Sequence, residues 1–466
     1  MTACMDMREK DMQRRIIALL GCLVILAFSG GCAENPEGDI IANKNEGVFE
    51  EKLKEQNVGN GQEQMDSYQD AFDVKKDGLH VSINAEVKML EGDIPVIRVA
   101  PHNITVEDVK AWSEALFGGN TAYDAKHVMT KTEIEEQILE LQSWINDPEE
   151  LLERYGSEEF VEETIAMFQQ EIALLEKQYQ EAPDTWEEQD SDWTFHPLTY
   201  YYDSAVDEES EDVQNLNRTE ALEVMSFLDG EKAYCKAYNR NESDYLMHRF
   251  SFFYENENNM IENSKPQEMS EEEAVQLAEK RLETMGIGEW EFERIDGSSD
   301  SEGSNYTVYF APVYNGISSL LPYGEVDLHS EDLYAAHLRN SSLVIRICNG
   351  MLISIELESP MDIVAVENEN IQVLSFEEIY TAFRNYAESG LQDEIIEKNG
   401  SPVENITITR IEQKLFRAKM QNSEGEFRMV PVWVFYGIAE DYMLQEVDLV
   451  VINAVDGSII DAGLGY

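Results

Sequence analysis

Residues 427–460 read FRMVPVWVFYGIAEDYMLQEVDLVVINAVDGSII. Two apolar runs rich in β-branched and aromatic residues lie on either side of a polar segment, and such runs are typical of strands. Asp456-Gly457 then separates the second run from a third, and Asp-Gly favours a two-residue turn between antiparallel strands. The stretch therefore predicts an antiparallel strand at 427–436 and a hairpin at 449–460.

A capped helix is predicted ahead of these strands. Ser375 stands three residues before Glu378 at the start of SFEEIYTAFRNY, the spacing of a capping box in which each side chain bonds the other residue's backbone N–H. Another strand is predicted at 407–420. This part of the chain thus predicts one helix followed by antiparallel strands.

The same order of elements occurs earlier in the chain. Ser270 and Glu273 form a second capping box. The elements that follow it are a helix at 271–285, strands at 290–295 and 306–314, and a hairpin at 343–355. Local strings agree as well, VIRICNGMLI with VINAVDGSII and APVYNG with VPVWVFYG. These matches predict an internal repeat, and we expect pairing or packing of the two sheets to protect the edge strands that an isolated copy would expose.

Two amphipathic helices are predicted between residues 130 and 182. Apolar residues recur every three or four positions, at Ile134, Ile138, Leu141 and Ile145 and again at Ile165, Phe168, Ile172, Leu175 and Tyr179. As a helical hairpin, the two stripes would face each other or an adjoining sheet. A coiled-coil docking surface is the functional alternative, but it needs more heptads than are present.

Strands are predicted on both sides of this hairpin. They cover 80–90 and 94–99 ahead of a helix at 105–116, and then a meander at 193–202, 222–228, 233–238 and 245–254. We therefore predict an α+β fold of antiparallel sheets, with a helical hairpin insertion and two C-terminal helix-plus-sheet units.

The N-terminus reads as an export signal. Basic residues up to Arg15 precede an apolar run from Ile16 to Phe28, followed by Ser29-Gly30-Gly31 and Cys32. The run is too short for a transmembrane helix, which needs about 20 residues, but it fits a signal peptide. Small residues directly before a cysteine resemble the bacterial lipobox, although Ser29 stands where that motif usually has Leu. The resemblance implies lipidation of Cys32; an ordinary secretory signal with an incidental cysteine is the alternative.

Five segments are expected along the chain. They are a lipoprotein signal peptide at 1–31, a flexible acidic tether at 32–70, an N-terminal α+β domain at 71–265 that contains the helical hairpin (130–182), and helix-plus-sheet units at 266–368 and 369–466. The polar, glycine-containing composition of the second segment is that of a linker.

The C-terminal strings resemble a known module. Pro431-Val432-Trp433 and Asn453-Ala454-Val455-Asp456-Gly457 are similar to the PepSY-type module of bacterial exported proteins, and the resemblance extends over residues 270–466. With the lipobox-like step and the acidic tether, the chain also resembles the uncharacterised lipoproteins of clostridial bacteria. This implies a non-catalytic role in binding or regulating extracytoplasmic partners, peptidases among them, and it carries over no catalytic residue.

The composition is that of a folded and very acidic protein. Hydrophobic residues make up 43% and aromatic residues 10%, against a formal net charge of −60. Such a charge repels nucleic acid phosphates and anionic lipid headgroups, so the sequence predicts no nucleic acid partner. Contact with the membrane is expected only through lipid on Cys32.

No catalytic, cofactor or metal motif is found in the sequence. The histidines have no i, i+4 pair, and nucleophile-elbow, P-loop and dinucleotide motifs are absent. Cys235 and Cys348 are read either as one disulfide or as lone buried thiols. The acidic clusters at 203–212 and 300–305 are expected to be solvated loops rather than calcium sites. Aromatic clusters at 200–202 and 250–254 are expected to be core rather than a glycan groove.

The sequence leaves three classes of function to consider. The leading hypothesis is a lipid-anchored protein on the extracytoplasmic face of the cell membrane, with a binding or regulatory role, no enzyme activity and no cofactor. A lipid-anchored hydrolase of cell-wall or extracellular polymer is the alternative, and a convergent carboxylate–histidine site in a pocket would favour it. A transporter's substrate receptor is disfavoured, because that class needs β-α-β units and the sequence predicts meanders.

Replacing Cys32 with alanine tests the anchor. Without the thiol no lipid can be attached, so we expect unprocessed precursor to accumulate and labelling with radioactive palmitate to disappear. A Cys32→Ala chain that is still processed and still partitions into detergent would show that the cysteine is incidental.

Overall fold

The computed structural model describes residues 46–55, 64–75, 78–126, 129–148, 151–152, 157–185, 190–200, 218–242, 245–257, 260–261, 264–300, 303–322, 341–399, 401–420, 425–439 and 446–460. These residues combine helices with two large sheets, and the fold is α+β, as predicted. The signal peptide, Cys32 and the first part of the predicted tether lie outside the described residues.

The chain divides into two compact units, neither of which is continuous in sequence. One contains residues up to Val96, Val366–Lys414 and the residues from Val430 onward, and we call it the terminal unit. The other contains Ile97–Ala365 and Leu415–Met429, and we call it the inserted unit.

The terminal unit is built on a sheet whose strands come from both parts of the chain that flank the insertion. Its strand order is β1-β2-β15-β16-β17-β18, with β2 and β15 parallel. The strands are β1 (Ser67–Val74), β2 (Leu79–Lys88), β15 (Asn405–Lys419), β16 (Phe427–Ala439), β17 (Val447–Asn453) and β18 (Ile459–Ile460). The helices are α2 (Glu46–Lys54), α10 (Phe376–Ser389) and α11 (Leu391–Asn399).

Helix α10 packs on the middle of this sheet. It begins at the predicted capping box, where the Ser375 side chain accepts from the Glu378 backbone N–H and the Glu378 side chain accepts in return. Ile379, Phe383 and Ala387 recur every four residues and form its buried face. The ring of Phe383 is stacked on that of Phe435 in β16, with centroids 4.3 Å apart.

The chain passes from one unit to the other inside strands. The connecting strands are β3 (Val96–Pro101), β14 (Met361–Asn368), β15 and β16. β3 pairs with β14 and with Phe427–Met429, the first residues of β16.

The inserted unit is built on an antiparallel sheet. Its order is β11-β10-β12-β13-β8-β7-β6-β4, with β9 beside β10 and β5 beside β6. The strands are β4 (Tyr123–Asp124), β5 (His196–Pro197), β6 (Glu220–Leu228), β7 (Glu231–Glu242), β8 (Tyr245–Tyr254), β9 (Trp290–Asp300), β10 (Gly303–Tyr314), β11 (Ile317–Ser318), β12 (Ser342–Cys348) and β13 (Met351–Glu358). The helical elements are α3 (Val106–Leu116), α4 (Lys131–Asn146), α6 (Glu158–Gln178), the 3₁₀ turn η2 (Leu198–Tyr200) and α9 (Glu271–Met285).

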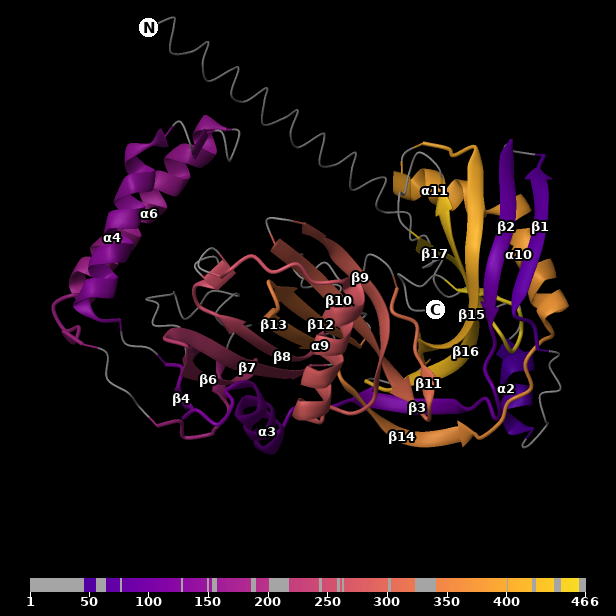
Figure 1. Ribbon diagram of the computed structural model, residues 1–466, viewed down its shortest axis with the longest axis horizontal. Helices are drawn as coiled ribbons and strands as arrows, with labels where there is room; N and C mark the ends of the chain where they lie inside the picture. The colour runs from indigo at the N-terminus through magenta and orange to yellow at the C-terminus, as the bar shows by residue number, and fades with distance from the viewer. Residues whose placement is uncertain are drawn as a thin grey trace, which may run out of the picture. The chain divides into compact units, whose positions relative to one another are not determined.

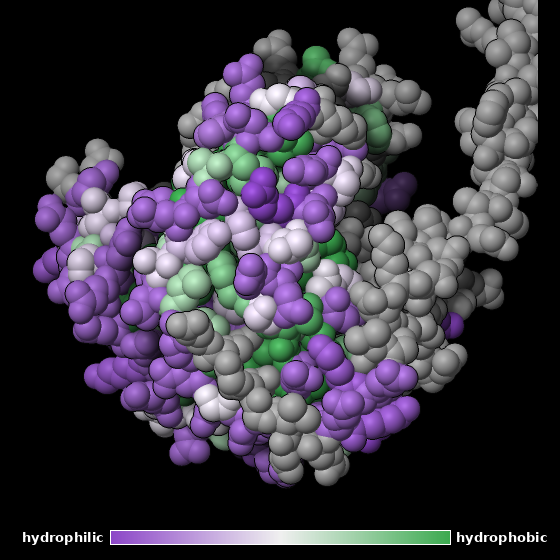
Figure 2. All heavy atoms as spheres, turned by 90° about the vertical axis from the view of Figure 1, so that its right-hand side faces the viewer, coloured by the Kyte–Doolittle hydropathy of each residue, from purple (hydrophilic) through white to green (hydrophobic). Residues whose placement is uncertain are grey.

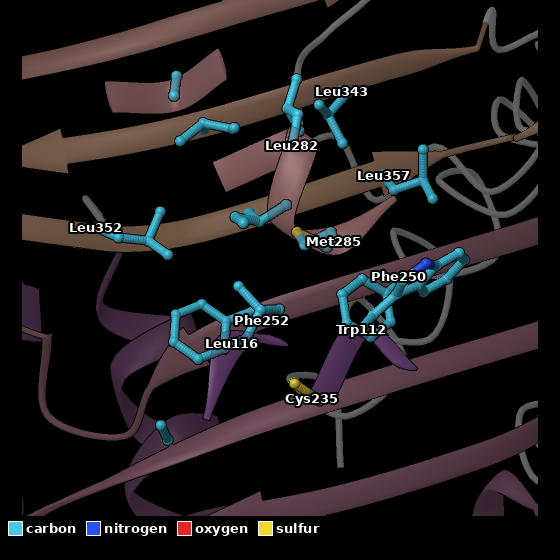
Figure 3. Packing of buried hydrophobic residues seen from close by; sticks show 14 of the residues in the cluster. Trp112, Leu116, Cys235, Phe250, Phe252, Leu282, Met285, Leu343, Leu352 and Leu357 are labelled. Atoms are coloured by element: carbon cyan, nitrogen blue, oxygen red, sulfur yellow. The ribbon is translucent and has the colours of Figure 1, made fainter. Parts of the chain in front are cut away.

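Helices α3 and α9 bury their apolar faces against this sheet (Figures 1 and 3). Trp112 and Leu116 of α3 point toward Phe250 and Phe252 of β8, and Met285 of α9 lies nearby (Figure 3). The rings of Trp112 and Phe250 meet edge to face at 4.9 Å. Each large side chain buried in this way contributes about 1.5–3 kcal/mol relative to an exposed one. Phe250 and Phe252 are therefore core, as the sequence predicted, whereas Phe253 and Tyr254 are partly buried.

The two segments predicted as a repeat share their strand order. α9 precedes the meander β9-β10-β12-β13, and α10 precedes β15-β16-β17-β18. The strand that pairs with the edge of each segment differs, however. β8 pairs antiparallel with β13, whereas β2 pairs parallel with β15. The two copies therefore do not pair with each other at these edges, because β8 and β2, both from the predicted 71–265 domain, take these positions.

Two further expectations need correction. The predicted tether at 32–70 contains α2 and the first half of β1, and Lys52 Nζ donates to the carbonyl of Val455 at 2.7 Å. The predicted boundary at 265/266 does not separate compact units, because β8 and β13 pair across it. The predicted 71–265 domain is likewise divided, since β1 and β2 belong to the terminal unit. The helical hairpin at 130–182 is confirmed.

Replacing Phe383 with alanine should lower the free energy of unfolding of the terminal unit by about 3–5 kcal/mol, the usual cost of removing a fully buried aromatic ring. Urea denaturation measures this. Phe160→Ala is the control, because Phe160 is exposed on α6 and should change stability by less than about 0.5 kcal/mol. Equal losses in the two variants would contradict the packing of α10.

Candidate docking surface on the helical hairpin

Helices α4 and α6 run side by side as an antiparallel pair (Figure 1). α4 begins at a capping box formed by Thr130 and Glu133. α6 begins after Ser157, whose side chain makes no capping hydrogen bond. The amphipathic spacing, more than the caps, therefore accounts for the length of α6.

The hairpin has a small core of its own. Its buried residues are Ile134, Leu141, Leu175 and Ala182, and the partly buried residues packed against them are Met129, Ile138, Phe168, Ile172 and Tyr179. Every member of this cluster comes from residues 129–182. The two predicted stripes therefore face each other rather than the sheet.

Ion pairs stabilise the end of the hairpin at which α4 begins. Lys131 Nζ lies 2.6 Å from an Asp184 carboxylate oxygen. Lys232, at the start of β7, lies between Glu133 at 3.1 Å and Glu255 at 3.4 Å. These contacts place Glu133 next to the sheet, while the rest of α4 and α6 contact chiefly one another.

A second apolar row runs along α6 outside this core. Phe160 is 60% exposed and Met167 is 56% exposed, and Leu174 is half-buried. The three residues are spaced by seven, so they fall on one side of the helix. Single exposed apolar residues are ordinary on protein surfaces, but three apolar residues at this spacing present one continuous face to a neighbouring helix, although they are too few for an extended coiled coil.

The edge of α4 next to this row can be located from one contact. Gln137 Nε2 donates to Glu171 Oε1 at 3.2 Å. On α4, Trp144 lies one heptad after Gln137. On the antiparallel α6, Thr164 lies one heptad before Glu171. Trp144 and Thr164 therefore share that edge, and both are half-buried. The row is thus bordered by a tryptophan and by polar side chains. We call Phe160, Met167, Leu174 and Trp144 the docking row.

The hairpin is strongly acidic around the docking row. α4 and α6 together contain ten glutamates and two lysines. Figure 2 shows a different face of the molecule, on which hydrophilic residues surround patches of hydrophobic ones. A ligand of the docking row must therefore tolerate or neutralise negative charge.

A second cluster surrounds His102 in the inserted unit. Its Nδ1 lies 3.0 Å from Asp362, and its Nε2 lies 3.2 Å from Asp108 in the capping box of α3. Although burial disfavours the charged ring, the two carboxylates raise the pKa of His102 above 6.5. A protonated imidazole donates from both nitrogens, which fits this arrangement. The ring then has no nitrogen left to take a proton from a substrate.

His248 near this cluster has the opposite character. Its ring is buried, and Nδ1 is 3.0 Å from the side-chain oxygen of Asn239. Burial, assisted by the charge on His102, lowers the pKa of His248 to about 4. His248 is therefore a neutral histidine of the core.

The two cysteines of the described strands are separate and buried. Cys235 lies in β7 and Cys348 in β12, and both are free thiols. Burial raises the pKa of Cys235, which disfavours the thiolate that a nucleophile needs. Of the two readings left open by the sequence, the lone buried thiol is the one observed.

The structure describes only part of the acidic and aromatic clusters that the sequence singled out. Residues 203–212, 201–202 and 301–302 lie outside the described residues, as does the predicted lipidation site Cys32. The predicted loop around Asp300 is instead a hairpin, because the β9–β10 ladder continues to the Asp300–Gly303 pair. Within the described chain, no group of three or more His, Cys, Asp or Glu residues is placed to hold a metal ion.

Sequence reasoning missed the docking row and the His102 cluster. The first had a signal in the heptad spacing of Phe160, Met167 and Leu174. The second joins residues that are 260 positions apart, His102 and Asp362, and no local pattern reveals such a pair.

Comparison with known proteins assigns no family. No protein-family model and no curated protein matches the chain. It is similar to an uncharacterized protein from Eubacterium rectale ATCC 33656, at 13% identity over 90% of this chain and 99% of that chain, with a TM-score of 0.37. None of the helices in the described residues is long and apolar enough to span a bilayer.

The His102 cluster makes a testable contribution to stability. Because the folded-state pKa lies above the unfolded value of 6.5, the stabilisation is complete below pH 6.5 and is lost as the pH rises through the folded pKa. An NMR titration should find the His102 pKa above 6.5 and lowered by Asp362→Asn. The exposed carboxylate of Asp184 is a control, and Asp184→Asn should leave the titration unchanged. A His102 pKa at or below 6.5 would contradict the geometry.

Proposed function

We propose that this chain is a lipid-anchored protein of the extracytoplasmic face, that its role is non-catalytic binding, and that the helical hairpin is its docking element. The observation that carries the proposal is the docking row. Phe160 and Met167 expose more than half of their surface on a helix whose other apolar stripe is already buried. Exposed apolar residues that continue along one helix face favour a protein partner.

The sequence supports the location. The lipobox-like step ahead of Cys32 fits an anchor at the membrane, and the polar residues that follow it would hold the folded units away from the surface. The net charge of −60 argues against a nucleic acid partner. PepSY-like modules in the C-terminal half remain part of the proposal, supported by the shared order of helix and strands in the two segments.

Site-specific photocrosslinking in producing cells tests the docking role. A photoreactive phenylalanine analogue at position 160 should give a discrete adduct with another protein. The same analogue at position 139 is the matched control, because Leu139 is 64% exposed on α4 but lies away from the docking row. Adducts at both positions, or at neither, would show that the docking row is not the binding surface.

A further inference from the structure

We propose that the docking row binds a basic amphipathic helix of a partner protein, which packs lengthwise on α6 as a third helix of the hairpin. This inference rests on the proposed function and names the chemistry of the partner. It follows from the spacing of the apolar residues, the border of the row and the charge of the hairpin.

The spacing selects a helix. Phe160, Met167 and Leu174 repeat every seven residues, and Thr164, Glu171 and Gln178 take the alternate positions of the same seam. Fourteen residues of α-helix extend over about 21 Å. A partner helix of about two to three heptads therefore matches the row along its whole length. An extended partner strand has no counterpart here, because the backbone hydrogen bonds of α6 are made within the helix.

The border of the row supplies the remaining contacts. The half-buried Trp144 lies on the adjoining edge of α4, and the Gln137–Glu171 hydrogen bond marks the middle of that edge. A third helix on α6 would cover Trp144 from one side. Large apolar side chains at the centre of an interface, surrounded by polar residues, are the arrangement in which a few residues provide most of the affinity.

The negative charge of the hairpin favours a positively charged partner. Glu171 lies within the seam itself, Glu140 is exposed on α4, and the two helices contain ten glutamates against two lysines. Lysines and arginines flanking the partner's apolar stripe would face these carboxylates. Exposed ion pairs add little affinity each, but complementary charge accelerates encounter and rejects wrong partners.

The same charge disfavours two other occupants. A second copy of the chain would bring one acidic hairpin against another, and like charges at an interface oppose association. An anionic lipid surface would be repelled for the same reason. A basic amphipathic helix would bury the exposed apolar side chains of the docking row and also neutralise the negative charge around them.

Fluorescence anisotropy with a designed peptide tests the proposal. The protein is the chain from residue 33 onward, which retains every residue that the structure describes. The probe is a labelled peptide of about 21 residues with leucine at the a and d positions and lysine at most others. We expect saturable binding that weakens in about 0.5 M salt. A peptide with glutamate in place of lysine should not bind.

Two variants of equal charge separate the docking row from general attraction to an acidic protein. Phe160→Ser combined with Met167→Ser should weaken binding by about tenfold or more, since two central apolar contacts are removed. Leu139→Ser removes a similarly exposed apolar side chain away from the row and should change Kd by less than about twofold. Circular dichroism should be the same for all three proteins, because the substituted residues lie outside the hairpin core.

Three outcomes would overturn the inference. If the double variant binds the peptide as well as the wild type, net charge alone attracts it. If a discrete crosslink forms at position 160 but the peptide does not bind, the proposed function stands and the basic helix is the wrong partner. If sedimentation shows a dimer that the double variant abolishes, the occupant of the row is a second copy of the chain.

Discussion

The parallel pairing of β2 with β15 is the contact on which the terminal unit depends. It aligns His80 with Asn405 and Lys88 with Glu412, and it joins residues about 325 positions apart in the chain. Glu412 is almost fully buried beside Lys88 at 3.0 Å. Burial raises the pKa of Glu412, but neighbouring cations lower it overall, so the carboxylate stays charged. Lys88 is 62% exposed, and Arg410 and Lys414 also lie beside Glu412, at 2.9 Å and 3.6 Å, so the buried carboxylate is balanced by three cations rather than by one buried partner.

A proline marks the place where β16 changes partner. Phe427–Met429 pair with β3, and Val432–Gly437 pair with β17. Pro431 lies between these two ladders, where its missing N–H is not needed, and its carbonyl accepts from Ala454 at 2.9 Å. A proline in an interior strand is therefore compatible with an unbroken strand at this position. The boundary between the two units, between Met429 and Val430, lies just before this proline.

Features encoded within a few residues were predictable, and those that join distant residues were not. The capping boxes at Ser270 and Ser375 were read from three-residue spacings, and α9 has its predicted bounds. The place of the β1–β2 hairpin in the terminal sheet was missed, because β15, which pairs with β2, lies at the other end of the chain. For the hairpin, periodicity located both helices. It could not show that the row containing Phe160 stays exposed, because a helical wheel reveals an apolar face but not what covers it.

The discontinuous terminal unit has a consequence for biosynthesis. At about 5–20 residues per second, β15 follows β2 out of the ribosome after roughly 15–65 s, given the 325 residues between them. The main sheet of the inserted unit is fully synthesised by Glu358, well before that time. Meanwhile the β1–β2 hairpin has an unpaired edge, the kind of edge at which chains aggregate. The segment of the fold that is made first is thus completed last.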